Sequence, residues 1–292
     1  MSNTSVKVDL HLHTIQSDGN LSPAELVKLA SEKNLEIISI TDHDITAGLA
    51  EAYESIKDNP HLTLIPGVEL STDIPGNEIH MLGYYMDYSD LFFQKTLERF
   101  RDGRVDRARQ MVRKLEKLGM PIDWDRVVEI AGEGAIGRPH IAAALVESGY
   151  VEYPKDAFDK YIGRNGIAYV ERVRVTPVEA VEILVKNGAM PVMAHPTYYS
   201  DRSQANDFSD LKSALFELKE AGLVGMEVHY KDYSPSLIME LQNIAGELEL
   251  IPCGGTDYHA SGNPDEPLPG FVGPPMETIT RLNTLKSKIS DN

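Results

Sequence analysis

The chain has 292 residues, of which 42% are hydrophobic and 25% charged, proportions typical of a globular protein with a substantial core. Its 28 basic and 45 acidic side chains give a formal net charge of −17, which should repel duplex DNA but does not exclude a small phosphorylated ligand or a short strand end. A single cysteine, Cys253, excludes an internal disulfide and a thiolate metal cage. Because no apolar run is long enough for a signal peptide or a membrane span, we expect a cytoplasmic protein without membrane contact.

Residues 8–13 alternate between hydrophobic and polar side chains, which is the period of a β-strand. The alternation places His11 and His13 on one face, one pleat apart, where they could hold one cation or two adjacent ones. Asp18 could reach the same point from the following loop. Spacing alone leaves open a half-buried strand whose histidines bond to the backbone.

Helices and strands alternate up to residue 85. Ser22-Pro23-Ala24-Glu25 has the form of a capping box with proline at the first helical position. His43 and Glu69 follow predicted strands, whereas His80 lies within one. The predicted elements are a helix from 22 to about 34, a strand over 36–40, a helix over 46–57, and strands over 62–65 and 78–85.

The chain loses this alternation between about residues 90 and 170. The pattern predicts helices over 89–118, 123–130 and 139–147, then a glycine-containing loop over 161–170 that leads to a further strand. Arginines of the first helix are interleaved with acidic residues, which favours a solvated face over a nucleic-acid stripe. These arginines are Arg99, Arg101, Arg104, Arg107, Arg109 and Arg113.

Alternation resumes after residue 175. Strands over 190–194, 224–228 and 249–253 are each preceded by a helix, over 176–187, 210–221 and 234–245, and a last helix runs to about 289. The pattern predicts a βα barrel with a parallel core, whose functional residues lie at the carboxyl ends of the strands. We therefore divide the chain into barrel segments 1–90 and 173–292 and a mostly helical insertion, 91–172. His195, Asp257 and His259 join the earlier candidates at the strand ends.

Five segments together resemble the PHP (polymerase and histidinol phosphatase) family. They are Asp9-Leu10-His11-Leu12-His13-Thr14, Thr41-Asp42-His43, Gly67-Val68-Glu69, Ala194-His195-Pro196 and Gly255-Thr256-Asp257-Tyr258-His259. The resemblance implies an α/β fold, a distorted (βα)7 barrel, with a phosphoesterase centre of two or three divalent metal ions. The ligands it implies are His11, His13, Asp18, His43, Glu69, His80, His195, Asp257 and His259.

The implied ligands account for the implied chemistry. Imidazoles and carboxylates without sulfur suit manganese, zinc or iron, and of these we expect manganese. Two such ions can hold a hydroxide and neutralise the oxygens of an in-line phosphoryl displacement. The leaving alkoxide still needs a proton, for which His195 and His259 are both candidates. Asp42 is interpreted as a partner that orients a histidine.

The insertion resembles the PHP subgroup that acts on nucleotides, which includes phosphatases for 3′,5′-bisphosphorylated nucleosides and a related 5′-to-3′ exonuclease. The matching segments are Gly137-Arg138-Pro139-His140-Ile141-Ala142, Tyr161-Ile162-Gly163-Arg164-Asn165-Gly166 and Ala168-Tyr169-Val170, with Ile167 where proline is expected. Arg138 and His140 are the candidate substrate-binding residues, because a guanidinium beside a helix N-terminus is a good anion site. Alternatively, Arg138 only caps or crosslinks the insertion.

We therefore expect a metal-dependent phosphatase that removes the 3′-phosphate of a 3′,5′-bisphosphonucleoside. The alternatives are a 5′-to-3′ exonuclease on short RNA or DNA, a histidinol-phosphate phosphatase, and a PHP barrel that binds metal without turnover. The expected partner is a small phosphorylated nucleotide or an oligonucleotide end. The sequence does not predict the oligomeric state.

Overall fold

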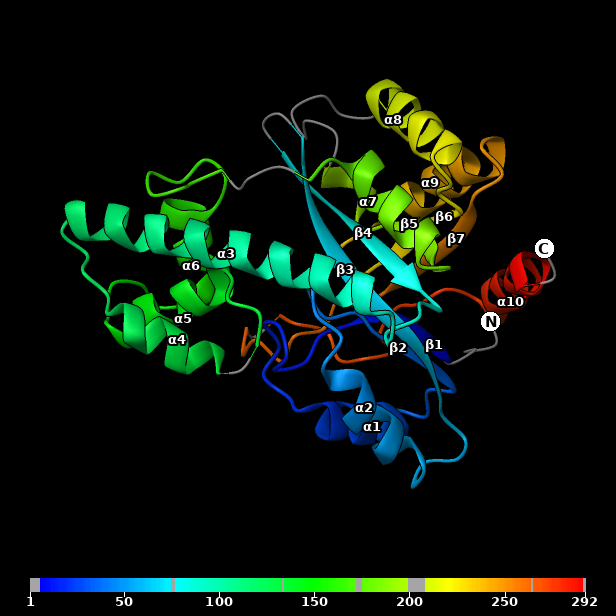
Figure 1. The fold of residues 1–292 in the computed structure, drawn as a ribbon, viewed down its shortest axis with the longest axis horizontal. Helices are drawn as coiled ribbons and strands as arrows, with labels where there is room; N and C mark the ends of the chain where they lie inside the picture. The colour runs from blue at the N-terminus through cyan, green and yellow to red at the C-terminus, as the bar shows by residue number, and fades with distance from the viewer. Residues whose placement is uncertain are drawn as a thin grey trace.

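The computed structural model describes residues 6–74, 77–132, 134–171, 175–198, 208–263 and 265–290. In this part of the chain, strands β1 to β7 form one sheet in sequence order. A bridge between Leu12 and Tyr258 joins the end of β1 to the residues after β7, so the sheet is nearly closed into a barrel (Figure 1). The strands are β1 (Val8–Leu12), β2 (Ile37–Ile40), β3 (Thr63–Ile74), β4 (Asn77–Tyr84), β5 (Met190–Met193), β6 (Gly225–Tyr230) and β7 (Ile251–Gly255).

The prediction of a wholly parallel core was wrong at β4. This strand pairs antiparallel with β3, where Ser71 lies opposite His80, and antiparallel with β5, where Leu82 lies opposite Val192. The connection between Ile74 and Asn77 is too short for the crossover that a parallel strand requires. The resulting hairpin brings His80 alongside the carboxyl end of the barrel.

Strand β3 is also longer than the sequence pattern indicated, because Pro66-Gly67 lies inside the strand and does not end it. At Gly67 a side chain would collide with the Ser39 hydroxyl on β2 and with the methyl group of Thr41, which follows β2 directly. Glycine therefore lets β3 pass close to β2 and continue to Glu69.

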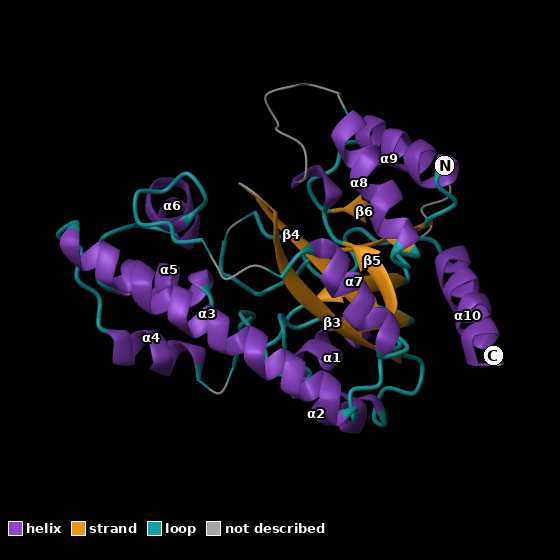
Figure 2. Ribbon diagram, turned by 45° about the horizontal axis from the view of Figure 1, so that its top comes forward, coloured by secondary structure: helices purple, strands orange, loops and turns teal. Residues whose placement is uncertain are grey.

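Helices surround the barrel sheet (Figure 2). They are α1 (Pro23–Glu32), α2 (Gly48–Ile56), α7 (Pro177–Lys186), α8 (Ser209–Glu220), α9 (Pro235–Glu247) and α10 (Met276–Ser290). The capping box predicted at the start of α1 is confirmed, with Glu25 accepting from the Ser22 backbone. A second capping box starts α7, where Glu179 accepts from the Thr176 backbone. None of the helices in the described ranges is long and apolar enough to cross a membrane.

The central helices form a lobe beside the barrel, at the left of Figure 1. They are α3 (Leu91–Lys117), α4 (Trp124–Ala131), α5 (Arg138–Glu147) and α6 (Pro154–Ala157), followed by a π-helical turn, η1 (Phe158–Ile162); a 3-10 turn, η2 (Pro196–Tyr198), follows β5. The lobe has a hydrophobic cluster of its own, which includes Met111, Leu115 and Leu145.

Residues 172–174, where the strand predicted after the 161–170 loop would run, lie outside the described residues, whereas residues 163–170 form no helix or strand, as predicted for this loop. The backbone there turns back on η1, because Gly163 N–H donates to the Phe158 carbonyl at 2.9 Å and Ala168 N–H donates to the Tyr161 carbonyl at 2.8 Å.

Candidate metal centre

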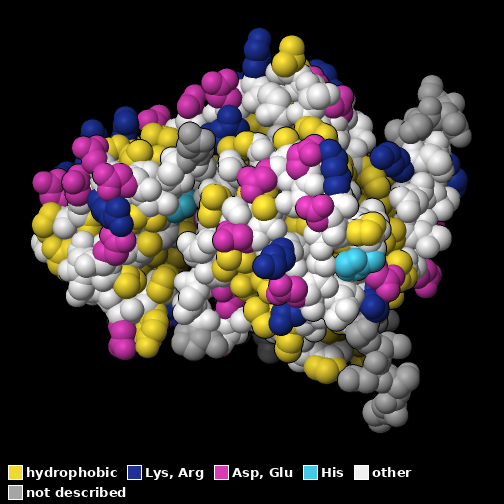
Figure 3. Space-filling view, turned by 90° about the horizontal axis from the view of Figure 1, so that it is seen from below, with side chains coloured by type: hydrophobic (Ala, Val, Ile, Leu, Met, Phe, Trp, Pro, Cys, Tyr) yellow, Lys and Arg dark blue, Asp and Glu magenta, His cyan; other side chains and the backbone are white. Residues whose placement is uncertain are grey.

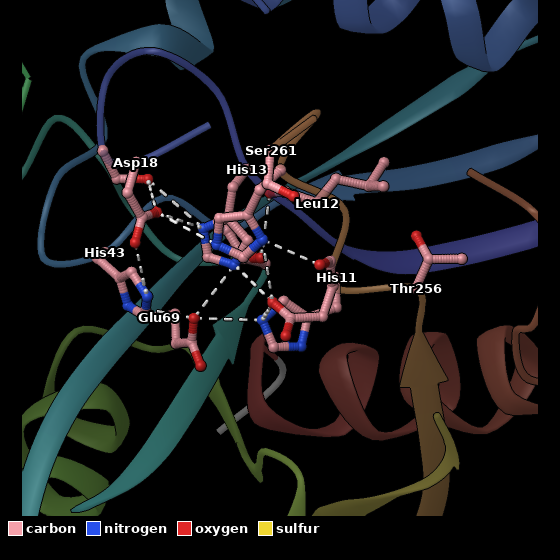
Figure 4. Close-up of polar contacts among 12 residues, drawn as sticks. His11, Leu12, His13, Asp18, His43, Glu69, Thr256 and Ser261 are labelled. Atoms are coloured by element: carbon pink, nitrogen blue, oxygen red, sulfur yellow. Dashed lines mark hydrogen bonds and ion pairs between the residues drawn. The ribbon is translucent and has the colours of Figure 1, made fainter. Parts of the chain in front are cut away.

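The strand ends and the β3–β4 hairpin bring the nine predicted ligands together at one rim of the barrel. Figure 4 shows five of them, His11, His13, Asp18, His43 and Glu69. Eight of them form three groups whose potential ligand atoms lie within 4.8 Å of one another. The groups are His13, Asp18, His43 and His259; His11, His13, Glu69 and Asp257; and His43, Glu69 and His80. The ninth, His195, places Nε2 3.2 Å from Glu69 Oε1. We call these nine residues the His–carboxylate cluster.

Glu69 lies at the centre of the cluster. Its Oε2 atom is 3.2 Å from Nε2 of both His11 and His13 and 3.1 Å from Nδ1 of His43. Its Oε1 atom is 2.8 Å from Nδ1 of His80. Burial by itself would raise the pKa of this carboxyl, but the surrounding imidazoles hold its pKa well below the usual range. The carboxylate is therefore ionised and placed where it could bridge two cations.

The cluster fits a group of divalent metal ions. His13 Nε2 and His43 Nδ1 are buried, and neither makes a hydrogen bond of good geometry with the described residues. Both atoms face the Glu69 carboxylate. Buried ring nitrogens normally have a partner, and a metal ion would supply one. The mixture of imidazole and carboxylate donors also suits borderline ions such as manganese, zinc or iron.

Asp18 is positioned by a short loop after β1. Its Oδ1 atom is 3.3 Å from His259 Nε2 and its Oδ2 atom is 3.6 Å from His43 Nε2. Buried Asp42 holds this loop by accepting hydrogen bonds from Thr14 N–H at 2.7 Å and from the Ser17 hydroxyl at 2.8 Å. Asp42 was predicted to orient a histidine, but its hydrogen bonds hold the loop between His13 and Asp18.

Sequence reasoning missed Glu227, which is buried on β6. Its Oε1 atom is 2.9 Å from His11 Nδ1, and its Oε2 atom accepts a 2.7 Å hydrogen bond from His195 N–H. A carboxylate behind a metal-binding imidazole fixes its tautomer and direction. The available signal in the sequence was a charged residue between the apolar residues Met226 and Val228 of a predicted strand.

The backbone at two cluster residues is unusual. His195 and Asp257 have φ angles of 28° and 50°, in a region that residues other than glycine seldom occupy.

Asp257 Oδ1 lies 3.2 Å from His13 Nε2, while its Oδ2 accepts a 2.8 Å hydrogen bond from the Tyr230 hydroxyl. Only one of its oxygens therefore faces the cluster.

A cavity of about 180 Å³ adjoins the cluster and is lined by Asp18, His43 and His80 on the barrel side. On the lobe side it is lined by three arginines, Arg104, Arg107 and Arg138, and we call it the arginine pocket. Cationic side chains beside a group of metal ligands can form a second anion-binding site.

The interpretation of the arginine series as a solvated face was wrong for Arg104 and Arg107. Arg104 Nε lies 2.6 Å from Oδ2 of buried Asp44, and a terminal nitrogen contacts the Ser71 hydroxyl. Arg107 is only 9% exposed and its Nε donates to the Val170 carbonyl at 2.7 Å. Partners distant in sequence turn these two side chains toward the pocket.

The two predicted substrate-binding residues lie in different settings. Arg138 lines the arginine pocket, and its guanidinium carbon is 5.5 Å from the centre of the Phe158 ring. His140 is buried, and its Nδ1 accepts a 2.9 Å hydrogen bond from Gly137 N–H. Burial lowers the pKa of His140, which favours a neutral ring that holds the start of α5.

Residues 9–103 match the family model of the PHP domain. The 5′-3′ exoribonuclease Rnm of Salmonella typhimurium is 34% identical over 88% of this chain and 87% of that protein. The 3′,5′-nucleoside bisphosphate phosphatase of Chromobacterium violaceum is 31% identical over 87% of this chain and 88% of that protein. A crystal structure of a proposed metal-dependent phosphoesterase from Bifidobacterium adolescentis has a TM-score of 0.84 and 31% identity, over 94% of both chains.

These similarities extend over most of the chain, including the lobe. The chain belongs to the PHP family, and the predicted distorted barrel is confirmed. It is a metal-dependent phosphoesterase.

Proposed function

We propose that the protein hydrolyses the phosphoester on the 3′ oxygen of a nucleotide that also carries a 5′-phosphate. The preferred substrate is a 3′,5′-bisphosphonucleoside, whose 3′-phosphate is released. The observation that carries the proposal is the arginine pocket, which shares Asp18, His43 and His80 with the His–carboxylate cluster. One phosphate could lie at the cluster while the other contacts the arginines.

The cluster would hold two or three divalent ions, with manganese as the expected metal. Such ions, when bound, supply a hydroxide at neutral pH and neutralise charge on the phosphoryl oxygens. Glu227 keeps the His11 ring directed at the cluster, and Arg138 orients the second phosphate. His195 and His259 are the candidates for donating a proton to the departing 3′ oxygen. The His259 side chain is the more accessible of the two, being 18% exposed compared with 6% for His195.

A substrate panel tests this proposal. Phosphate release is measured with manganese on a 3′,5′-bisphosphonucleoside, the corresponding 3′- and 5′-monophosphates, and a generic aryl phosphate. We expect the bisphosphate to have a kcat/KM at least about tenfold above every monophosphate, since one good charge-assisted contact contributes about 1.5–3 kcal/mol. If no nucleotide is hydrolysed faster than the aryl phosphate, the nucleotide assignment is wrong.

A second candidate activity is 5′-to-3′ exonuclease action on short 5′-phosphorylated RNA or DNA. It is favoured by the similarity to the exoribonuclease Rnm, and it breaks the same bond between phosphorus and the 3′ oxygen. On the face seen in Figure 3, basic side chains are interspersed with acidic ones and form no broad basic band. Together with the net charge of −17, this favours short substrates. A ladder assay on end-labelled oligonucleotides separates the two activities.

A further inference from the structure

A buried carboxylate that the proposed reaction does not use lies between the His–carboxylate cluster and the arginine pocket. Asp44 directly follows His43 in the sequence and is fully buried. Its backbone N–H donates to the Glu69 carbonyl at 3.0 Å, which holds the residue beside the cluster. The side chain of Asp44 therefore starts at the cluster, and the groups that it contacts show what it can position.

The Asp44 carboxylate contacts groups on two different elements. Its Oδ2 atom lies 2.6 Å from Nε of Arg104 on α3, and its Oδ1 atom accepts a 3.0 Å hydrogen bond from Ser71 N–H on β3. A carboxylate is costly to bury unless a cation and hydrogen bonds compensate its charge. Arg104, whose side chain is 12% exposed, supplies such a cation. The ion pair thus connects the rim of the barrel with α3.

This ion pair fixes the direction of the Arg104 guanidinium. Because the group is planar, a partner that holds Nε also sets the plane in which the two terminal nitrogens lie. One terminal nitrogen contacts the Ser71 hydroxyl, and Nη1 faces Gly137, where a Cβ atom would lie 3.3 Å from it. Gly137 directly precedes Arg138. The guanidinium is therefore held between the barrel rim and the start of α5, in the wall of the arginine pocket.

A second arginine of α3 holds the backbone of the same aspartate. Arg101 lies three residues before Arg104, and its Nη1 donates to the Asp44 carbonyl at 2.9 Å. Side chains three residues apart lie on the same face of a helix. Both arginines therefore converge on Asp44, and a shift of α3 along the rim would break both contacts.

We propose that Asp44 is a positioning residue that holds the Arg104 guanidinium ready in the arginine pocket to receive the second phosphate. This inference rests on the proposed function and identifies a residue that determines the preference for a bisphosphate. An arginine side chain has many rotamers, and fixing it before the substrate arrives lowers the entropic cost of binding. Removal of the negative Asp44 side chain should therefore weaken binding of the second phosphate, whereas charge repulsion alone would predict tighter binding.

The test measures kcat/KM with manganese for a 3′,5′-bisphosphonucleoside and for the corresponding 3′-monophosphate, and compares their ratio between variants. Because both substrates are measured on the same preparation, a loss of folded protein or of bound metal cancels in the ratio. We expect Asp44→Asn to lower the ratio at least about fivefold, mainly through the KM of the bisphosphate. Asparagine tolerates the φ angle of 56° at this position, so the substitution removes the charge without straining the backbone.

Further variants separate positioning from a general effect on the structure. Asp44→Gly, which also tolerates the positive φ angle, should lower the ratio in the same way and decides the question if Asp44→Asn does not fold. Asp106→Asn, at an exposed position of α3, is the matched control and should leave the ratio unchanged. In an Arg104→Met background, Asp44→Asn should have no further effect on the ratio, because the group that it positions is gone. Circular dichroism checks the folding of each variant.

The outcomes distinguish failure of this inference from failure of the proposed function. Wild-type protein that does not prefer the bisphosphate over the monophosphate overturns the proposed function. If the wild type has this preference, and the folded Asp44 variants leave it unchanged or raise it, the positioning role is wrong and the proposed function stands. The positioning role is equally wrong if Asp44→Asn lowers the ratio as much in the Arg104→Met background as in the wild type.

Discussion

Glu69 shows how a single residue organises the candidate centre. Both of its oxygens face imidazoles, from β1, from the segment after β2, from β4 and from the segment after β5. Behind this contact layer, Glu227 holds His11 from the opposite ring nitrogen. A ligand residue such as His11 is thus held in place by a residue that contacts the side of its ring facing away from the cluster.

At the residue scale, Glu227→Gln should weaken metal binding. The amide can still accept from His11, but its NH2 group would then face the His195 N–H donor, which Glu227 Oε2 now satisfies. We expect a loss of about 10–100-fold in manganese affinity, as is usual for such supporting partners. Elemental analysis and metal titration measure it.

Glu247→Gln is the matched control for this substitution, because Glu247 is 59% exposed and pairs only with surface Lys212 at 2.7 Å among its described contacts. It should bind manganese like the wild type. Equal affinity in the Glu227 variant would show that this carboxylate does not support the cluster.

Arg138→Met tests the second phosphate site. Because the guanidinium lines the arginine pocket, we expect the preference for a 3′,5′-bisphosphonucleoside over a 3′-monophosphate to fall about tenfold, with the change mainly in KM. Arg109→Met, an exposed arginine of α3 that packs over the Trp124 ring, is the control. An unchanged preference would mean that Arg138 only crosslinks the insertion.

Among the elements, α3 connects the barrel and the lobe. Its first half buries Phe93 and Leu97 in the barrel core, and its second half buries Met111 and Leu115 in the lobe core. Arg104 lies between these halves and faces the arginine pocket. We propose that residues 91–172 form a separate folding unit on this helix, between barrel segments 1–90 and 173–292.

Leu115→Ala should therefore destabilise the lobe more than the barrel. Removing a fully buried leucine costs about 2–5 kcal/mol. We expect hydrogen exchange to accelerate over residues 91–172 while the barrel strands keep their protection. Leu118→Ala, at a position 44% exposed, should have little effect. Equal acceleration in barrel and lobe would contradict the division.

Local patterns predicted much of this arrangement because their causes are local. The capping box at Ser22 and Glu25 lies within one helical turn, and the alternation around His11 is contained in β1. The direction of β4 was wrong, since it depends on how short the preceding connection is. Glu227 and Arg104 were missed or misinterpreted because their partners are 216 and 60 residues away in the sequence.

At the scale of the whole molecule, positive charge is concentrated where the chemistry needs it. The chain has a net charge of −17, yet three arginines line the pocket beside the cluster. The lobe and the barrel both contribute to this pocket, so neither part alone contains the complete candidate site. The arrangement favours small anionic substrates that enter between the two parts.

The most direct test of the central claim measures metal content and phosphate release on the same preparation of Asp18→Ala. This substitution removes a carboxylate that faces His43 and His259 without disturbing the barrel core. We predict that bound manganese falls and that hydrolysis of the 3′,5′-bisphosphonucleoside falls with it, by at least about 100-fold. Reduced metal content with unchanged hydrolysis would contradict the claim that the cluster is the catalytic centre.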